Sequence, residues 1–87
     1  MEPTRTPLGA YLHELRTAVR VDRRILSQGG LVARCALPGI TQTTVSHFEI
    51  GDRLPSVVQL EAILTALGAG DAERARALRL AGVRAAA

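Results

Sequence analysis

Residues 39–55, GITQTTVSHFEIGDRLP, form the stretch that decides the fold. After a tight Pro-Gly turn, Thr41 is well suited to cap the start of a helix. Val45 and Phe48 lie three residues apart and form an apolar face on that helix. Gly51 is expected to end the helix in the left-handed conformation that glycine adopts without strain. The stretch therefore predicts a short, capped helix whose inner face packs against a core.

The outer face of this helix carries short side chains that form hydrogen bonds: Gln42, Thr43, Thr44, Ser46 and His47. Side chains of this kind can read base edges in the major groove, because Gln suits adenine, Ser and Thr suit several bases, and His can donate to guanine. Residues 41–62 carry one Arg against three acidic residues. Any DNA contact there would read bases with neutral side chains, and phosphate contacts would fall mainly to arginines on either side.

The flanking segments have the apolar periodicity of helices. The first helix is expected from about Pro7 to Arg20, with leucines recurring every three or four residues after a Thr-Pro start. A second begins with a Ser-x-x-Gln capping box at Ser56 and ends at Gly68. Asp71 is expected to cap a last helix. Together these segments predict an all-α protein.

The stretch from Val21 to Ile40 leaves two interpretations open. Asp22 is suited to cap a short helix, whereas Gly29 and Gly30 are poor helix-interior residues that cost about 1 kcal/mol each relative to alanine. Either two short helical segments flank a glycine hinge, or one bent helix spans the region. The basic residues before and within this stretch are expected to be solvated and to supply, as a group, a positive field; they are Arg16, Arg20, Arg23 and Arg24.

The composition supports one small helical domain. The 87 residues suffice for a single core, which must be aliphatic because Tyr11 and Phe48 are the only aromatic residues. This argues against a small β-barrel or sandwich, and against an aromatic platform for single-stranded nucleic acid. The single cysteine, Cys35, excludes an internal disulfide framework and a cysteine-rich zinc site. No apolar run is long enough for a membrane span.

The pattern resembles the lambda-repressor-like, xenobiotic-response-element family of helix-turn-helix DNA-binding proteins. The matching residues are Leu8 to Arg16, then Thr41-Gln42-x-Thr44-Val45-Ser46-x-Phe48-Glu49-x-Gly51, then Arg53, Pro55-Ser56 and the leucine-rich helix to Gly68. The resemblance covers residues 7–82. It implies a compact all-α bundle of about five helices with a central helix-turn-helix, a flexible tail at 1–6 and a frayed end at 83–87.

The resemblance also implies the roles of individual residues. The expected base contacts are Gln42, Thr43, Ser46 and His47. Thr41, Thr44 and Arg53 are expected to contact phosphates. Glu49 matches a position that is mostly structural in this family.

The distance from the first helix to Thr41 is about eight residues longer than is usual in the family, which leaves two registers. If Asp22-Arg23 begins the scaffold helix, Arg23 is the phosphate-contacting residue at its start. If Ser27-Gln28 begins it, Gln28 takes that role.

The predicted function is sequence-specific binding of double-stranded DNA by a transcriptional regulator that acts as a dimeric repressor or autoregulator. Dimer contacts are expected on the last helix, from Ala75, Leu78, Leu80 and Gly82. The alternative is a protein-interaction module, antitoxin- or adaptor-like, that keeps the fold without binding DNA and has a toxin or another regulator as its partner.

Catalysis, cofactors and bound metals are not expected. The His13-Glu14 pair lacks the second histidine of a zinc-protease motif, because Thr17 stands in its place. No membrane association is expected. The protein is expected in the cytoplasm, associated with the nucleoid because it binds DNA.

Overall fold

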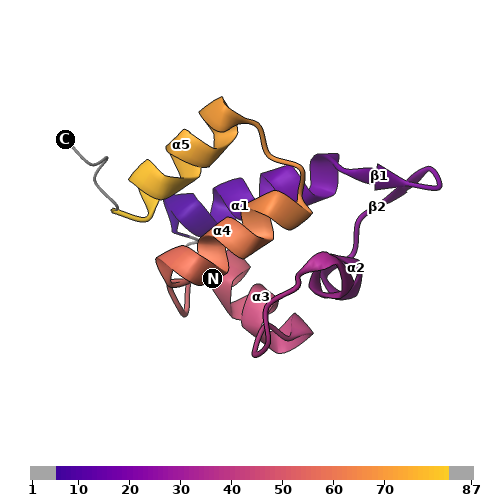
Figure 1. Cartoon of the computed structure of the whole chain (residues 1–87), viewed down its shortest axis with the longest axis horizontal. Coiled ribbons are helices and arrows are strands. Elements are labelled where there is room, and N and C mark those ends of the chain that lie inside the picture. The colour runs from indigo at the N-terminus through magenta and orange to yellow at the C-terminus, as the bar shows by residue number, and fades with distance from the viewer. Residues whose placement is uncertain (1–5, 83–87) are drawn as a thin grey trace, which may run out of the picture.

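Residues 6–82, which the computed structural model describes, form five helices and one two-stranded antiparallel hairpin (Figure 1). In chain order these are α1 (Pro7–Ala18), β1 (Arg20–Val21), β2 (Arg24–Ile25), α2 (Gln28–Arg34), α3 (Gln42–Ile50), α4 (Val57–Ala66) and α5 (Asp71–Leu80). The prediction of a small bundle of five helices with a central helix-turn-helix is confirmed. Of the tail predicted at 1–6, residues 1–5 lie outside the described residues, as does the frayed end predicted at 83–87, whereas Thr6 is described and caps α1.

Side-chain caps begin most of the helices where the sequence predicts them. The Thr6 hydroxyl accepts a hydrogen bond from the backbone N–H of Gly9 at 3.0 Å, and that of Thr41 accepts from the N–H of Thr44 at 3.2 Å. Ser56 and Gln59 form the expected capping box at the start of α4. Gly51 ends α3 with a φ of 98°, as predicted.

Two predicted helix limits are wrong by one or two residues. The first helix ends at Ala18 rather than Arg20, because the backbone becomes extended at Val19 and enters the hairpin. The N-cap of α5 is Gly70, so Asp71 is the first helical residue and not the cap. The Glu73 carboxylate accepts from the Gly70 N–H at 3.0 Å and satisfies that amide instead.

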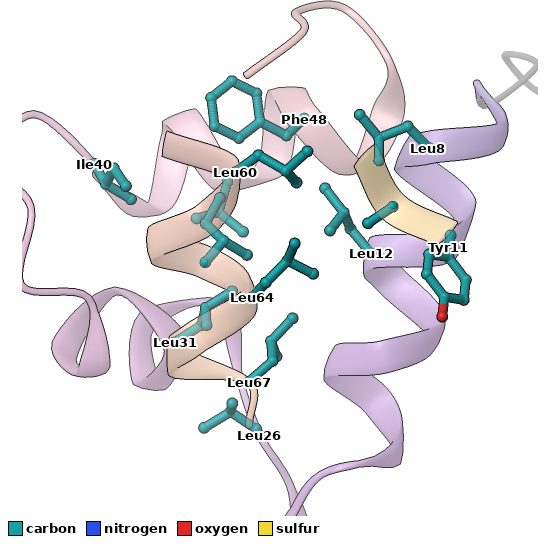
Figure 2. Close-up of a cluster of buried hydrophobic side chains, with 13 residues drawn as sticks. Leu8, Tyr11, Leu12, Leu26, Leu31, Ile40, Phe48, Leu60, Leu64 and Leu67 are labelled. Atoms are coloured by element: carbon teal, nitrogen blue, oxygen red, sulfur yellow. The ribbon is translucent and has the colours of Figure 1, made fainter. Parts of the chain in front are cut away.

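The core lies between α1, α3 and α4. Figure 2 shows Leu12 of α1 pointing toward Leu60 and Leu64 of α4, with Phe48 of α3 at one end of the cluster. Leu31 from α2 packs into the same cluster. All of these side chains are almost fully buried, so the predicted aliphatic core is present and α3 is fixed against it through its apolar face.

Both interpretations of residues 21–40 are wrong. Asp22 caps no helix: with Arg23 it forms the turn of the hairpin, and both residues have positive φ, 50° and 68°. Arg20 pairs with Ile25, and Val21 pairs with Arg24. A single helix, α2, follows the hairpin. Local hydrogen bonding across the turn prevails over the weak helical pattern of the sequence.

The two glycines of this stretch lie in the first turn of α2 rather than at a hinge. The Ser27 hydroxyl caps the helix by accepting from the Gly30 N–H at 2.9 Å. A side chain at Gly30 would collide with Leu26, since an added Cβ would lie 2.9 Å from its Cδ1. Glycine at this position therefore leaves room for the buried Leu26 side chain.

Candidate nucleic-acid interface

The helices α2 and α3 meet around a small polar hollow. Gln28 at the start of α2 and Gln42, Thr43 and Ser46 of α3 line this hollow, whose volume is about 290 Å³. Gln42 and Thr43 are exposed, and Gln28 and Ser46 are half-buried. We call these four residues the α2–α3 face. The fold thus gathers three of the four expected base-contact residues and one expected phosphate-contact residue into one surface.

The side chain of Gln42 brings α3 into contact with the start of α2 at this face. A Cβ added at Gly29 would lie 3.6 Å from the side-chain oxygen of Gln42. The Gln42 side chain therefore extends over the first turn of α2. Because Gln42 is the first residue of α3, this arrangement places a neutral amide, with both donors and an acceptor, at the N-terminal end of that helix.

The threonines at the start of α3 form a local pair. The hydroxyl groups of Thr41 and Thr44 lie 3.0 Å apart, in addition to the cap that Thr41 forms with the Thr44 N–H. Thr41 is exposed and Thr44 is half-buried. Thr41 and Thr44 are next in the chain to Gln42 and Thr43 of the α2–α3 face, and the sequence predicts phosphate contacts for both.

His47 and Arg53 lie at the opposite end of α3. The Nδ1 atom of His47 is 3.3 Å from a carboxylate oxygen of Asp52, and the two side chains are 39% and 62% exposed, respectively. Arg53 is exposed in the loop that follows Gly51. His47 therefore has an acidic residue beside it. Within the described residues, neither Gln42 nor Thr43 forms a salt bridge or hydrogen bond with an acidic side chain.

Behind this surface is a buried ion pair between Glu49 of α3 and Arg16 of α1. The Nε and Nη2 atoms of Arg16 donate to the two carboxylate oxygens of Glu49 at 2.7 and 2.9 Å. The side chains of both residues are buried, with the residues 8% and 3% exposed. Such a bidentate contact joins the two helices and also fixes their relative orientation.

Further hydrogen bonds complete the surroundings of this pair. His13 Nδ1 lies 3.0 Å from a Glu49 oxygen, and the side-chain N–H of Gln28 donates to the same oxygen at 3.3 Å. Burial alone raises the pKa of Glu49, but the hydrogen bonds from Arg16 and His13, the charge of Arg16 and the hydrogen bond from Gln28 together hold that pKa below its ordinary value. The carboxylate is therefore stabilised in its ionised form.

This cluster shows one error in the sequence-based reasoning. Arg16 was expected to be a solvated charge, but it is buried and its Nη1 atom also donates to the backbone oxygen of Leu26 at 2.8 Å. Its position four residues after Leu12 places it on the apolar stripe of α1, and that spacing was the available signal. By contrast, Glu49 has the structural role that the resemblance implies.

The structure separates the two candidate registers. Ser27 caps α2, Gln28 is its first residue and Leu31 is buried in the core, as the second register requires. Arg23 lies at the hairpin turn, so it does not begin a scaffold helix and is not part of the α2–α3 face.

Residues 7–77 match a family model described as a helix-turn-helix domain. The chain belongs to this family of helix-turn-helix DNA-binding proteins. Comparison with curated proteins and with solved structures gave no match. In the helix-turn-helix domain, α2 is the first helix of the motif, α3 is the second, and residues 35–41 connect them.

Two further observations concern the described part of the helix-turn-helix domain. Residues 6–82 contain no group of three His, Cys, Asp or Glu side chains placed to share a metal ion. None of the helices within these residues combines the length and the apolar character needed to cross a membrane.

Proposed function

We propose that the protein is a lambda-repressor-like regulator that binds double-stranded DNA sequence-specifically, with α3 in the major groove. The observation that carries this proposal is the α2–α3 face, where neutral hydrogen-bonding side chains from both helices of the motif share one exposed surface. The buried Arg16–Glu49 pair supports it, because it holds α3 rigidly while leaving the outer side chains free.

Each residue has a proposed role in this complex. Gln42 and Thr43 read bases first, because the N-terminal end of the second helix enters the groove deepest. Ser46 and His47 follow one turn later. The phosphate contacts flanking the groove are assigned to Gln28, Thr41, Thr44 and Arg53. Gln28 also donates to Glu49, so its side chain is already oriented before DNA arrives.

We further propose that the protein acts as a homodimer on a two-fold operator. A single module buries only about 600–1,000 Å² of protein surface on DNA, which limits its specificity. The predicted contact surface on α5 is partly used within the chain, since Leu78 and Leu80 pack against the core. A more exposed apolar patch lies after α3, at Leu54, Val57 and Val58.

The position of this patch suits a dimer on DNA. From the middle of α3 to Leu54 the chain spans at most about 20 Å. A two-fold contact at the patch can therefore place two α3 helices about 34 Å apart, which is one turn of B-DNA. We assign the second copy of the chain, and not a different protein, as the occupant of this patch.

In this proposal the protein represses transcription, including that of its own gene, by occupying an operator. The second candidate is a protein-interaction module without DNA binding. It is favoured by the acidic residues near α3 and α4, Asp52 and Glu61, both of which are exposed. Neither carboxylate lines the α2–α3 face, so these two residues do not count against the DNA proposal.

Fluorescence anisotropy tests the DNA proposal. The probes are duplexes from the region upstream of the protein's own gene, measured at several salt concentrations with the wild type and a Gln42→Ala, Thr43→Ala variant. We expect specific binding that the variant weakens about tenfold or more, with weak non-specific binding retained, because one bidentate base contact contributes about 1–3 kcal/mol of discrimination.

The matched control is Thr65→Ala, which alters an exposed threonine of α4 outside the α2–α3 face. It should bind as the wild type does. Equal binding to all duplexes, or equal affinity of the wild type and the Gln42→Ala, Thr43→Ala variant, would contradict base reading by α3 and favour the protein-interaction module.

A further inference from the structure

The hairpin between α1 and α2 is strongly basic and exposed. Arg20, Arg23 and Arg24 are all exposed, against one acidic residue, Asp22. None of the three guanidinium groups forms an ion pair with a side chain of residues 6–82. Three unpaired arginines within five residues form a concentrated positive charge that no contact within the described chain explains.

The hairpin is anchored firmly at its base. The backbone N–H of Leu26 donates to the Val19 oxygen at 3.0 Å, which closes the stem. The Leu26 oxygen in turn accepts from Arg16, so the stem is tied to the buried ion pair. A two-residue turn joins the strands at the tip. The arginines are therefore presented on a short, ordered stem rather than on a free loop.

The hairpin leads directly into the α2–α3 face. Only Leu26 and Ser27 separate β2 from Gln28, so the end of β2 lies within about 11 Å of the start of α2. Figure 1 shows the hairpin projecting outward from the helices, beyond the end of α1 and on the same side as α2. A duplex whose backbone passes the start of α2 would continue toward the hairpin.

The side chains of the hairpin favour phosphate over an apolar partner. Cross-strand pairing places Arg20 beside Ile25 on one side of the hairpin and Arg24 beside Val21 on the other, with Arg23 at the turn. Each side therefore has one guanidinium group and one apolar side chain, too little apolar surface for a stable protein contact. Guanidinium groups are well matched to phosphate oxygens.

We propose that this hairpin is a second DNA-binding element, in which Arg23 at the turn and the arginine on the side facing the duplex bind backbone phosphates outside the base pairs that α3 reads. This inference rests on the proposed function, because it requires the α2–α3 face to be on the same duplex. The hairpin lengthens the connection between α1 and α2, and in this proposal it increases the affinity for DNA regardless of the base sequence.

The test compares the salt dependence of DNA binding in two triple variants. One replaces Arg20, Arg23 and Arg24 with Gln. The other, a control with the same change in formal charge, replaces Arg34, Arg74 and Arg79 with Gln at the end of α2 and on α5. Each phosphate contact contributes about 0.9 to the slope of log affinity against log salt. We expect the hairpin variant to lower that slope by about 2, for the turn arginine and the one facing the duplex, and the control by less than about 1.

A second arm locates the contact on DNA. Hydroxyl-radical footprinting should show wild-type protection of backbone sugars beyond the half-site, and the hairpin variant should lose that protection while retaining protection within the half-site. Shortening the duplex on that side should lower the affinity of the wild type for DNA and leave the affinity of the hairpin variant unchanged. Circular dichroism checks folding, and the single Arg23→Gln change at the turn provides a milder variant.

Several results would overturn the proposal. One such result is equal salt slopes for the two triple variants, and another is a wild-type affinity that does not change when the flanking duplex is removed. Either would mean that the hairpin arginines are solvated and do not contact DNA. The loss of affinity in the Gln42→Ala, Thr43→Ala variant would still support base reading by α3. A change in solution mass of the hairpin variant, with the slope unchanged, would mean that the hairpin joins protein chains. Absence of specific DNA binding by the wild type would remove the proposed function and this inference together.

Discussion

Glu49 links the inside of the molecule to the surface that we propose reads DNA. Its carboxylate contacts Arg16, His13 and Gln28, and Gln28 also lines the α2–α3 face. A buried carboxylate is costly unless it is paired and fully hydrogen-bonded. A change at any of its partners is therefore expected to affect stability first and the geometry of the face as a consequence.

Replacing Arg16 with Met should destabilise the protein strongly. The substitution leaves the Glu49 carboxylate buried without its cation and the Leu26 oxygen without its side-chain donor, and breaking a buried pair typically costs about 3–5 kcal/mol. Urea unfolding measures the loss. The control Arg20→Met removes an exposed arginine and should change the free energy of unfolding by less than about 0.5 kcal/mol.

A double variant separates an unpaired charge from a lost contact. Arg16→Met combined with Glu49→Leu removes both charges, so part of the lost stability should return. If the double variant is less stable than Arg16→Met alone, the cost comes from packing rather than from the uncompensated carboxylate.

The same carboxylate predicts how stability depends on pH. The pKa of Glu49 in the folded state lies below its ordinary value of 4.5, so the folded protein holds this proton less readily than the unfolded chain does. The resulting stabilisation is complete above the unfolded pKa and is lost as pH falls through the folded pKa. Urea unfolding of the wild type and Glu49→Gln at a series of pH values should show their difference shrinking below about pH 4.5. A difference that is constant across that range would contradict the assignment.

At the scale of elements, the contact between α1 and α3 depends on a glycine. A Cβ added at Gly9 would lie 2.5 Å from the backbone oxygen of Glu49 and 2.7 Å from that of Phe48. Both neighbours are backbone atoms, so neither can rotate away. The absence of a side chain at Gly9 thus sets how closely the two helices approach.

Gly9→Ala should destabilise the protein by about 1–3 kcal/mol, although alanine is the better helix former. The matched control is Gly29→Ala in α2, where the nearest atom to the added Cβ is 3.6 Å away. That variant should be as stable as the wild type or more stable by up to about 1 kcal/mol. Thermal unfolding compares the two, and equal effects would refute the role of close packing.

The sequence predicts helices well where caps and apolar spacing agree. Thr41 and Gly51 delimit α3, and the capping box at Ser56 begins α4, as expected. The hairpin could not be predicted, because Asp22-Arg23 has no glycine to indicate two successive positive φ values. Arg16 was placed wrongly because its ion-pair partner, Glu49, is 33 residues away and meets it only through tertiary packing.

At the scale of the whole molecule, the candidate site is predictable in part. The sequence identified the polar residues of α3, since their identity and helical spacing are local properties. It left Arg23 and Gln28 as alternatives, and only the placement of Ser27 and Leu31 in α2 distinguishes them. The contacts of all these residues with DNA remain predictions.

The exposed apolar patch at Leu54, Val57 and Val58 predicts that the whole molecule forms a dimer. Leu54 and Val58 are each more than 60% exposed, with values of 64% and 63%. Val58→Glu should raise the dissociation constant of the proposed dimer about tenfold or more, because two carboxylates would meet across its two-fold axis, while leaving monomer stability nearly unchanged. Sedimentation equilibrium measures the effect.

The comparison variant is Ala75→Glu, which places the same charge on the exposed side of α5. It should dimerise as the wild type does. If Ala75→Glu dissociates the dimer and Val58→Glu does not, the contact lies on α5, where the sequence alone suggested it.

The tight turn at Asp22-Arg23 also makes the hairpin an adjustable part of an otherwise fixed scaffold. Its stem closes at Val19 and Leu26, so residues added beyond that closure leave the core contacts of every helix in place. Insertions of one residue on each strand would alternate which side of the hairpin the new pair of side chains occupies. Natural variation or engineering can therefore change the hairpin's reach and charge stepwise, without a new core having to evolve.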